Sequence, residues 1–210
     1  MKYDSIILDV DGTLWDSTEV VAGVWIRAVR ENGFPMWSIT GDQLKQYFGK
    51  TMAVIAAEML PGTSDMQRLS VMEDCCKYEH TALEEYDGDL TYPNVRETII
   101  KLSEMLPVCI VSNCQAGYIE LFMSKNEVDR YVTDTECFGN NGLGKADNIK
   151  LLVERNGFKN PVYVGDTDGD LSACEEAGVP FIYASYGFGT VDESRIAGKI
   201  DAFSELPDLL

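Results

Sequence analysis

Short, fully apolar runs recur along this chain and are separated by segments with helical periodicity. Runs without polar–apolar alternation are typical of strands in parallel sheets that are covered on both faces. Because these runs alternate with helices, they predict a parallel, doubly wound α/β sheet. The predicted strands are residues 5–10, 107–111, 161–164 and 181–183, with a weaker candidate at residues 131–138. The helices expected among them are residues 95–106, 115–125, 145–156 and 171–177.

A long helical block follows the first predicted strand. Ser17 or Thr18 can cap its first helix, in which apolar residues recur at helical spacing. No strand signal interrupts the block. We therefore expect two domains, an α/β core made of residues 1–15 and 89–210 and an all-helical insert at residues 16–88. The expected helices of the insert end near Asn32, Gly49, Leu60 and Tyr86.

The chain is strongly acidic, with 35 Asp and Glu against 17 Lys and Arg and a formal net charge of −18. Nucleic acids and anionic membranes require a basic face, so neither is an expected partner. An anionic substrate would require a metal ion or placed cations that locally reverse this field. The first residues lead directly into Asp4 and Asp9. We therefore expect no signal segment or membrane anchor and predict a cytoplasmic location.

Cysteine and histidine usage argues against zinc and disulfide chemistry. The six cysteines form no C-x-x-C pair, and His80 is the only histidine. A zinc site is therefore not expected, and we predict reduced, mostly buried thiols. Any mechanism based on a Ser-His or Cys-His pair would depend on His80. Because His80 lies in a long helical stretch with no nucleophile pattern beside it, we interpret it as structural.

Polar residues follow three of the predicted strands, where ligands bind in doubly wound sheets. Carboxylates crowded at one sheet edge repel one another and raise each other's pKa, a cost that a divalent cation removes. Oxygen ligands without histidine favour Mg²⁺. The polar residues are Asp9 and Asp11 after the first strand, Ser112 and Asn113 after the second, and Asp166 and Asp170 after the third.

The segment Asp9-Val10-Asp11-Gly12-Thr13 directly follows the first predicted strand. Residues two apart point the same way in an extended chain, so the carboxylates of Asp9 and Asp11 can reach one site. Gly12 lets the backbone turn away tightly. Position at a strand end makes this pattern far more specific than an isolated Asp-x-Asp tripeptide.

These residues resemble the first motif of the haloacid dehalogenase-like (HAD) hydrolase superfamily. Ser112-Asn113 resembles the second motif, Lys145 matches the third by position, and the segment 165–170 resembles the fourth. The motifs occur in the order of the family and span the chain. The helical insert resembles the mobile cap of the subfamily that includes phosphoglycolate phosphatases and β-phosphoglucomutases.

The resemblance implies a role for each motif residue in phosphoryl transfer. Asp9 would be the nucleophile and would form an aspartyl-phosphate. Asp11 would protonate the leaving oxygen and then deprotonate the attacking water. Ser112 would hold a phosphoryl oxygen, and Lys145 would neutralise charge on the transferring group and on Asp9.

The resemblance also implies a magnesium site and its surroundings. Asp9 and Asp166 would bind Mg²⁺ through their carboxylates, and Asp11 would bind it through its backbone carbonyl. Asp170 would orient metal-bound water or Lys145. Asn113, beside the serine of the second motif, would contribute to substrate binding.

Two features depart from the family pattern. The third-motif lysine is followed by Ala146 rather than the frequent proline, so Lys150 is an alternative for that role. Lys145 nevertheless opens a predicted helix, where a cation opposes the helix dipole, so local stability does not explain it. Asp168 is an additional acid in the fourth motif, and we expect it to face water in a turn.

Substrate specificity in the relatives depends on a loop between the second and third cap helices. Here that loop is residues 48–51, in which Lys50 could hold a substrate carboxylate or hydroxyl, or could instead be a solvated lysine. Trp15, beside the first motif, could line the pocket or pack in the core.

Together these residues predict a Mg²⁺-dependent phosphatase that acts on a small soluble phosphomonoester as a monomer or dimer. A phosphomutase on the same fold is an alternative, because the phosphoenzyme could meet a second substrate hydroxyl instead of water. A receiver-like phospho-acceptor module uses a similar acid pair, but the helical insert of roughly 70 residues argues against this compact unit. An inactive binding scaffold is a further alternative, although every catalytic position is filled.

Overall fold

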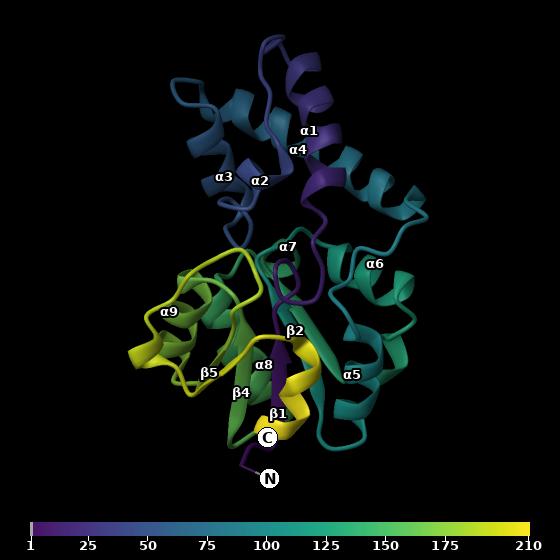
Figure 1. Cartoon of the computed structure of the whole chain (residues 1–210). Coiled ribbons are helices and arrows are strands. Elements are labelled where there is room, and N and C mark those ends of the chain that lie inside the picture. The colour runs from purple at the N-terminus through teal and green to yellow at the C-terminus, as the bar shows by residue number, and fades with distance from the viewer. Residues whose placement is uncertain (1) are drawn as a thin grey trace. The chain divides into compact units, whose positions relative to one another are not determined.

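The computed structural model describes residues 2–210 and divides them into two compact units. One unit consists of the chain up to Asp16 together with Leu90–Leu210, and the other is Ser17–Asp89. The first unit contains all the strands of the described chain, whereas the second contains four helices (Figure 1).

The larger unit is built on a six-stranded, entirely parallel sheet, which confirms the predicted α/β class. The spatial order is β3-β2-β1-β4-β5-β6, so the N-terminal strand lies near the middle. The strands β1, β2, β4 and β5 carry only buried residues, as their apolar sequences predict. The strands are β1 (Ser5–Leu8), β2 (Val108–Ser112), β3 (Asp134–Cys137), β4 (Pro161–Gly165), β5 (Phe181–Ala184) and β6 (Gly198–Ile200).

Helices cover both faces of this sheet (Figure 1). On one face, Ile149 of α8 and Leu171 of α9 pack with Ile7 and Tyr163 of the central strands in a continuous apolar core. Helix α5 packs against β2 on the other face, and its residues Ile99 and Leu102 are fully buried. The helices of this unit are α5 (Val95–Ser103), α6 (Tyr118–Lys125), α7 (Phe138–Asn141), α8 (Lys145–Asn156), α9 (Asp168–Ala177) and α10 (Leu206–Leu209).

The smaller unit packs its longest helices, α1 and α4, against each other. Inside it, the indole nitrogen of Trp25 donates to Oε2 of the buried Glu79 at 2.8 Å. Capping boxes begin two of its helices, at Thr40 and at Ser64, and each satisfies backbone amides that a helix start leaves unpaired. The helices are α1 (Thr18–Glu31), α2 (Gly41–Leu44), α3 (Met52–Met59) and α4 (Asp65–Glu85), and His80 lies on α4.

Several element boundaries differ from the sequence-based expectations. Helix α2 ends at Leu44, and the chain continues to Gly49 in turns such as that from Tyr47 N to Leu44 O. Helix α9 begins at Asp168 rather than at residue 171, because Thr167 forms a capping box with Asp170. Strand β6 was not predicted, since it is a three-residue edge strand without an apolar run.

The two chain segments that join the units run side by side. The amide of Asp16 donates to the carbonyl of Leu90 at 2.9 Å, and the amide of Tyr92 donates to that of Leu14 at 3.1 Å. Trp15 and Thr91 form an antiparallel bridge between these bonds. The segment that follows the first motif is therefore fixed to the segment that re-enters the core.

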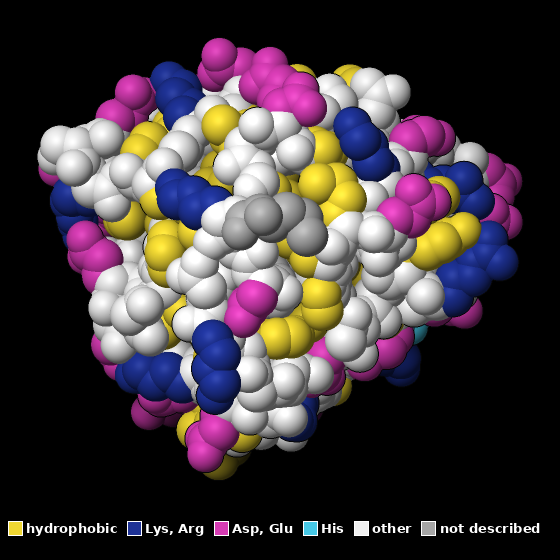
Figure 2. Space-filling view, turned by 90° about the horizontal axis from the view of Figure 1, so that it is seen from below, with side chains coloured by type: hydrophobic (Ala, Val, Ile, Leu, Met, Phe, Trp, Pro, Cys, Tyr) yellow, Lys and Arg dark blue, Asp and Glu magenta, His cyan; other side chains and the backbone are white. Residues whose placement is uncertain are grey.

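The surface and the thiols agree with the composition of the chain. Within residues 2–210, no helix combines the length and the apolar character needed to cross a membrane. On the face shown in Figure 2, basic and acidic side chains are interspersed, and no large area carries basic side chains alone. All six cysteines are free thiols, and five of them are buried.

Candidate active site

The three central strands end at one edge of the sheet and bring the predicted site residues to it. Asp9 follows β1, and its amide donates to the carbonyl of Val164 on β4 at 2.9 Å. Asp166 directly follows β4, and Ser112 is the last residue of β2. Asp9 is 1% exposed, Asp166 is fully buried and Ser112 is 3% exposed. Parallel pairing therefore brings together polar residues that are far apart in the sequence.

Lys145 joins two of the buried carboxylates. Its ammonium group lies 2.8 Å from Oδ1 of Asp9 and also contacts Oδ1 of Asp170. Lys150, the alternative for this position, is half-exposed and lies 3.3 Å from Glu176. The structure therefore brings Lys145, and not Lys150, to Asp9.

Asp170 is held by contacts on both of its carboxylate oxygens. Oδ1 faces Lys145, while Oδ2 accepts hydrogen bonds from the amides of Asp166 and Thr167 at 3.2 and 3.0 Å. The hydroxyl of Thr167 donates to the same oxygen at 2.7 Å. Asp170 thereby links the start of helix α9 to the lysine.

Three carboxylates of this edge, those of Asp9, Asp166 and Asp170, each place an oxygen within 4.8 Å of the others. Oδ2 of Asp9 is buried and accepts no hydrogen bond in the structure. A buried carboxylate oxygen without a donor is costly unless a cation contacts it. Asp170 already faces the ammonium group of Lys145, whereas the oxygens of Asp166 accept from two neutral donors, the Phe188 amide and the Thr13 hydroxyl. Asp9 and Asp166 are therefore the carboxylates that fit Mg²⁺ best.

The crowding of charge shifts the protonation equilibria of this cluster. Burial raises the pKa of Asp9 to about 7, against the opposing charge of Lys145 and with a further contribution from Asp170. Burial also raises the pKa of Asp166 well above its usual range, and the charges of Asp170 and Asp9 add to the rise. Burial alone would lower the pKa of Lys145, but the two carboxylates outweigh it and raise that pKa. The repulsion predicted from the sequence is present, although burial is the larger cause.

A loop after β5 that no sequence motif had indicated also supports Asp166. The amide of Phe188 donates to Oδ2 of Asp166 at 2.7 Å, while the hydroxyl of Thr13 donates to Oδ1 at 3.3 Å. A Cβ atom at Gly187 would lie 2.6 Å from Cγ of Asp166, so only glycine lets the loop approach this closely. The available signal was a glycine shortly after a predicted strand, which often marks a close backbone approach.

Gly12, which belongs to the first motif, also lies close to the carboxylate of Asp166. Its φ is +80°, and a Cβ atom there would lie 2.7 Å from Cγ of Asp166. The glycine of the first motif therefore serves both the tight turn, as predicted, and contact with the fourth motif.

Asp11 lies beside two aromatic donors that the sequence did not assign to it. The indole nitrogen of Trp15 donates to Oδ1 of Asp11 at 3.0 Å, and the hydroxyl of Tyr118 donates to the same oxygen at 2.7 Å. Trp15 is 1% exposed and packs edge-on against Tyr118 and Phe122. Of the two interpretations of Trp15, core packing is therefore the one that the structure supports.

The remaining predicted residues lie as follows. Asn113 is half-buried directly after Ser112. Lys50 forms an ion pair with Glu58 within the helical unit, with 2.6 Å between Nζ and Oε2. Asp168 is exposed, as expected, but it lies in the first turn of α9 rather than in a turn outside a helix.

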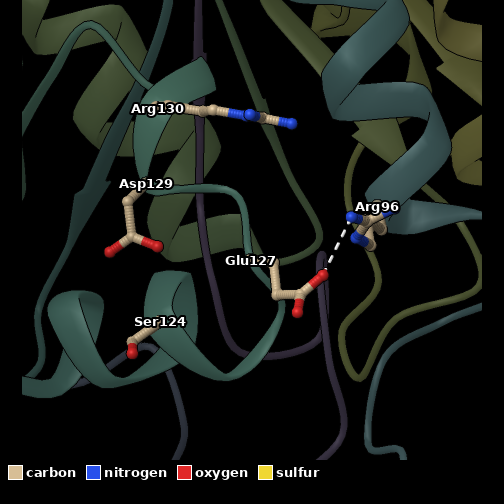
Figure 3. A pocket seen from close by; sticks show the side chains of 5 residues that line it. All are labelled: Arg96, Ser124, Glu127, Asp129 and Arg130. Carbon is tan, nitrogen blue, oxygen red and sulfur yellow. Dashed lines mark hydrogen bonds and ion pairs between the residues drawn. The ribbon is translucent and has the colours of Figure 1, made fainter.

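A separate hollow of about 410 Å³ lies near helices α5 and α6 (Figure 3). Arg96 and Glu127 form an ion pair of 3.0 Å on its wall. None of its lining residues is a predicted site residue. These residues are Arg96, Ser124, Glu127, Asp129 and Arg130.

Comparison with known proteins identifies the class to which this fold and site belong. A family model described as haloacid dehalogenase-like hydrolase matches residues 6–184. The chain therefore belongs to the haloacid dehalogenase-like hydrolase family. This finding confirms the resemblance carried by the four motifs and the expectation of an enzyme.

Individual relatives agree with this assignment. A phosphoglycolate phosphatase from Vibrio parahaemolyticus is 24% identical over 224 residues, which cover 98% of this chain and 95% of the relative. A phosphoglycolate phosphatase from Synechococcus elongatus is 26% identical, with coverage of 98% and 95%. The crystal structure of a predicted phosphoglycolate phosphatase from Haemophilus somnus has a TM-score of 0.86 at 18% identity. It covers 100% of this chain and 98% of that chain, which shows a shared fold.

The buried ion cluster predicts that substitutions of two lysines on helix α8 differ greatly in their effect on stability. Lys145→Met leaves Asp9 and Asp170 buried without their cation, so the free energy of unfolding should fall by about 3–5 kcal/mol. Lys150→Met removes an exposed pair and should change that free energy by less than about 1 kcal/mol. Urea unfolding of both metal-free variants measures the difference, and equal losses would contradict the structural importance of the Lys145 cluster.

Proposed function

We propose that this protein is a Mg²⁺-dependent phosphatase that hydrolyses a small phosphomonoester through an aspartyl-phosphate intermediate. The observation that carries the proposal is the set of contacts made by the Asp9 carboxylate at the end of a central strand. One of its oxygens contacts Lys145, the other is buried without a hydrogen bond, and Asp166 lies beside it. Membership of the hydrolase family and relatives named phosphoglycolate phosphatase support the proposal.

In the first half-reaction the Asp9 carboxylate attacks phosphorus, and the bond between phosphorus and the ester oxygen breaks. The electron pair of that bond leaves on the ester oxygen, which takes a proton from Asp11. Lys145, 2.8 Å from Asp9, stabilises negative charge on the transferring group. Ser112 holds a phosphoryl oxygen, and Asn113 beside it contributes to binding.

In the second half-reaction a water molecule attacks the phosphorus of the aspartyl-phosphate. Asp11 accepts the proton of that water, and the bond between phosphorus and Asp9 breaks. Inorganic phosphate leaves, and Asp9 is restored as a carboxylate. Asp170 contributes by positioning Lys145, whose ammonium it contacts.

The carboxylates of Asp9 and Asp166, together with the main-chain carbonyl of Asp11, would hold the magnesium ion. The ion supplies charge neutralisation at the phosphoryl oxygens, which an acidic protein must provide before it can bind a phosphate. The glycines and the Phe188 amide that hold Asp166 would keep the site in shape.

The helical unit Ser17–Asp89 is proposed to act as a cap that excludes water during phosphoryl transfer. Within it, Lys50 would bind the part of the substrate distant from the phosphate. For its location we propose the cytoplasm, which suits six free thiols, with the protein acting as a monomer or dimer.

Hydrolysis of a panel of small phosphate esters tests the proposed activity. We expect Mg²⁺-dependent phosphate release, with 2-phosphoglycolate included because the relatives carry its name. Excess EDTA should abolish release, and Asp9→Asn should lower it by more than about a thousandfold while the fold is retained. The absence of release from every ester would contradict the phosphatase, and full activity in EDTA would contradict its dependence on Mg²⁺.

Calorimetric titration with Mg²⁺ tests the ligand assignment without relying on activity. Asp166→Asn removes a carboxylate ligand and should weaken Mg²⁺ binding by at least about tenfold. Asp11→Asn keeps the main-chain carbonyl and should weaken it much less. Equal losses of affinity in the two variants would exclude the different roles assigned to these residues.

The role of Lys50 predicts a substrate-dependent effect. Lys50→Ala should raise KM for a carboxylate-bearing phosphoester by roughly ten- to a hundredfold, since a charge-assisted hydrogen bond is worth about 1.5–3 kcal/mol. The KM for 4-nitrophenyl phosphate, which has no carboxylate, should change little. Because Lys50 pairs with Glu58, Glu58→Gln is a useful comparison that keeps the lysine. If both substrates respond equally, Lys50 does not contact the carboxylate.

A further inference from the structure

We propose that Trp15 and Tyr118 form a clamp that positions Asp11 for proton transfer, an inference that rests on the proposed phosphatase function. Both side chains donate to one oxygen of Asp11, Tyr118 at 2.7 Å and Trp15 at 3.0 Å. The clamp adds two positioning residues to the acid–base group of that site.

The two donors come from separate parts of the core and are themselves fixed. Tyr118 begins helix α6, and its ring meets that of Trp15 edge-on with centroids 5.5 Å apart. Trp15 also packs against Phe122, and its main chain forms a bridge with Thr91. Both donor side chains are 1% exposed. A carboxylate that accepts from two buried, packed donors has little freedom to rotate.

The chemistry of the donors also determines which oxygen of Asp11 exchanges protons. An indole N–H only donates, so the Oδ1 atom that faces it must act as an acceptor. A proton on Oδ1 would compete with the two donors for the lone pairs of that atom. The proton that Asp11 delivers therefore belongs on Oδ2, and the clamp orients this atom. General acid catalysis requires such orientation, because the acid must lie within hydrogen-bond reach of the leaving oxygen.

Kinetics can distinguish residues that position the acid Asp11 from residues with a purely structural role. An alkoxide is a poor leaving group and depends on protonation, whereas 4-nitrophenolate leaves without much help. The kcat/KM value reports phosphoryl transfer to Asp9, the step in which the leaving group departs. Loss of the clamp should therefore lower kcat/KM for an alkyl phosphate much more than for 4-nitrophenyl phosphate. A general loss of folded structure would affect both esters equally.

The test compares Tyr118→Phe with the wild-type enzyme on both esters. The variant keeps the ring and removes only the hydroxyl. We expect kcat/KM for the alkyl ester to fall by about ten- to a hundredfold, given the strength of a hydrogen bond to a charged group. The value for 4-nitrophenyl phosphate should change less than about threefold, because its leaving group needs little protonation. Tyr78→Phe is the control, because its hydroxyl also donates to a carboxylate, that of Glu31 at 2.6 Å, but within the helical unit.

Trp15→Phe removes the other donor and should give the same dependence on the leaving group. Each variant removes one hydrogen bond to the same oxygen, so either one carries the test if the other does not fold. Equal losses on the two esters, or no loss on either, would overturn the clamp while leaving the phosphatase in place. A wild-type protein that hydrolyses neither ester would overturn the proposed function and the clamp with it.

Discussion

The ion pair between Lys145 and Asp9, extended to Asp170, connects the parts of the sequence that form the site. It ties the end of β1 to the starts of helices α8 and α9. Lys145 lies at a helix N-terminus, where the dipole disfavours a cation, and its side chain is only 3% exposed. Apolar residues in place of the lysine and both of its carboxylate partners could fill this space without loss of stability, although removal of the lysine alone could not. The presence of a lysine there is therefore better explained by the chemistry proposed for Asp9 than by the demands of folding.

The same cluster explains how an acidic protein could bind an anionic substrate. Three carboxylates and one ammonium group leave two negative charges uncompensated, which a single divalent cation would neutralise. Burial, and then the proximity of the other carboxylates, raises the pKa of Asp166 and that of Asp9. Binding of such a cation would be coupled to folding, because the cation would offset a charge repulsion that exists only in the folded chain. The contacts that hold Asp166 fix the shape of the cluster before a cation binds.

The sheet and the edge that carries the candidate site could be predicted because both depend on local patterns. Asp9 and Asp166 each follow a buried apolar run, and parallel pairing then brings the run ends together. Contacts between loops that are distant in the sequence leave no such local pattern. Phe188 reaches Asp166 through its main-chain amide, which every residue except proline possesses. Trp15 could be placed in the pocket or in the core, and no pattern singled out Tyr118. Both are buried, and their polar atoms meet at Asp11 only in three dimensions. Strand β6 escaped prediction because an edge strand this short carries almost no apolar signal.

The central claim is that Asp9 becomes covalently phosphorylated during turnover. Borohydride reduces an acyl phosphate but not a free carboxylate, and it would convert a phosphorylated Asp9 to homoserine. Wild-type protein quenched during hydrolysis of a phosphate ester can be reduced in this way and mapped by peptide mass spectrometry. We expect conversion at Asp9, dependent on both the ester and Mg²⁺. Continued hydrolysis with an unmodified Asp9, or conversion at a different carboxylate, would contradict it.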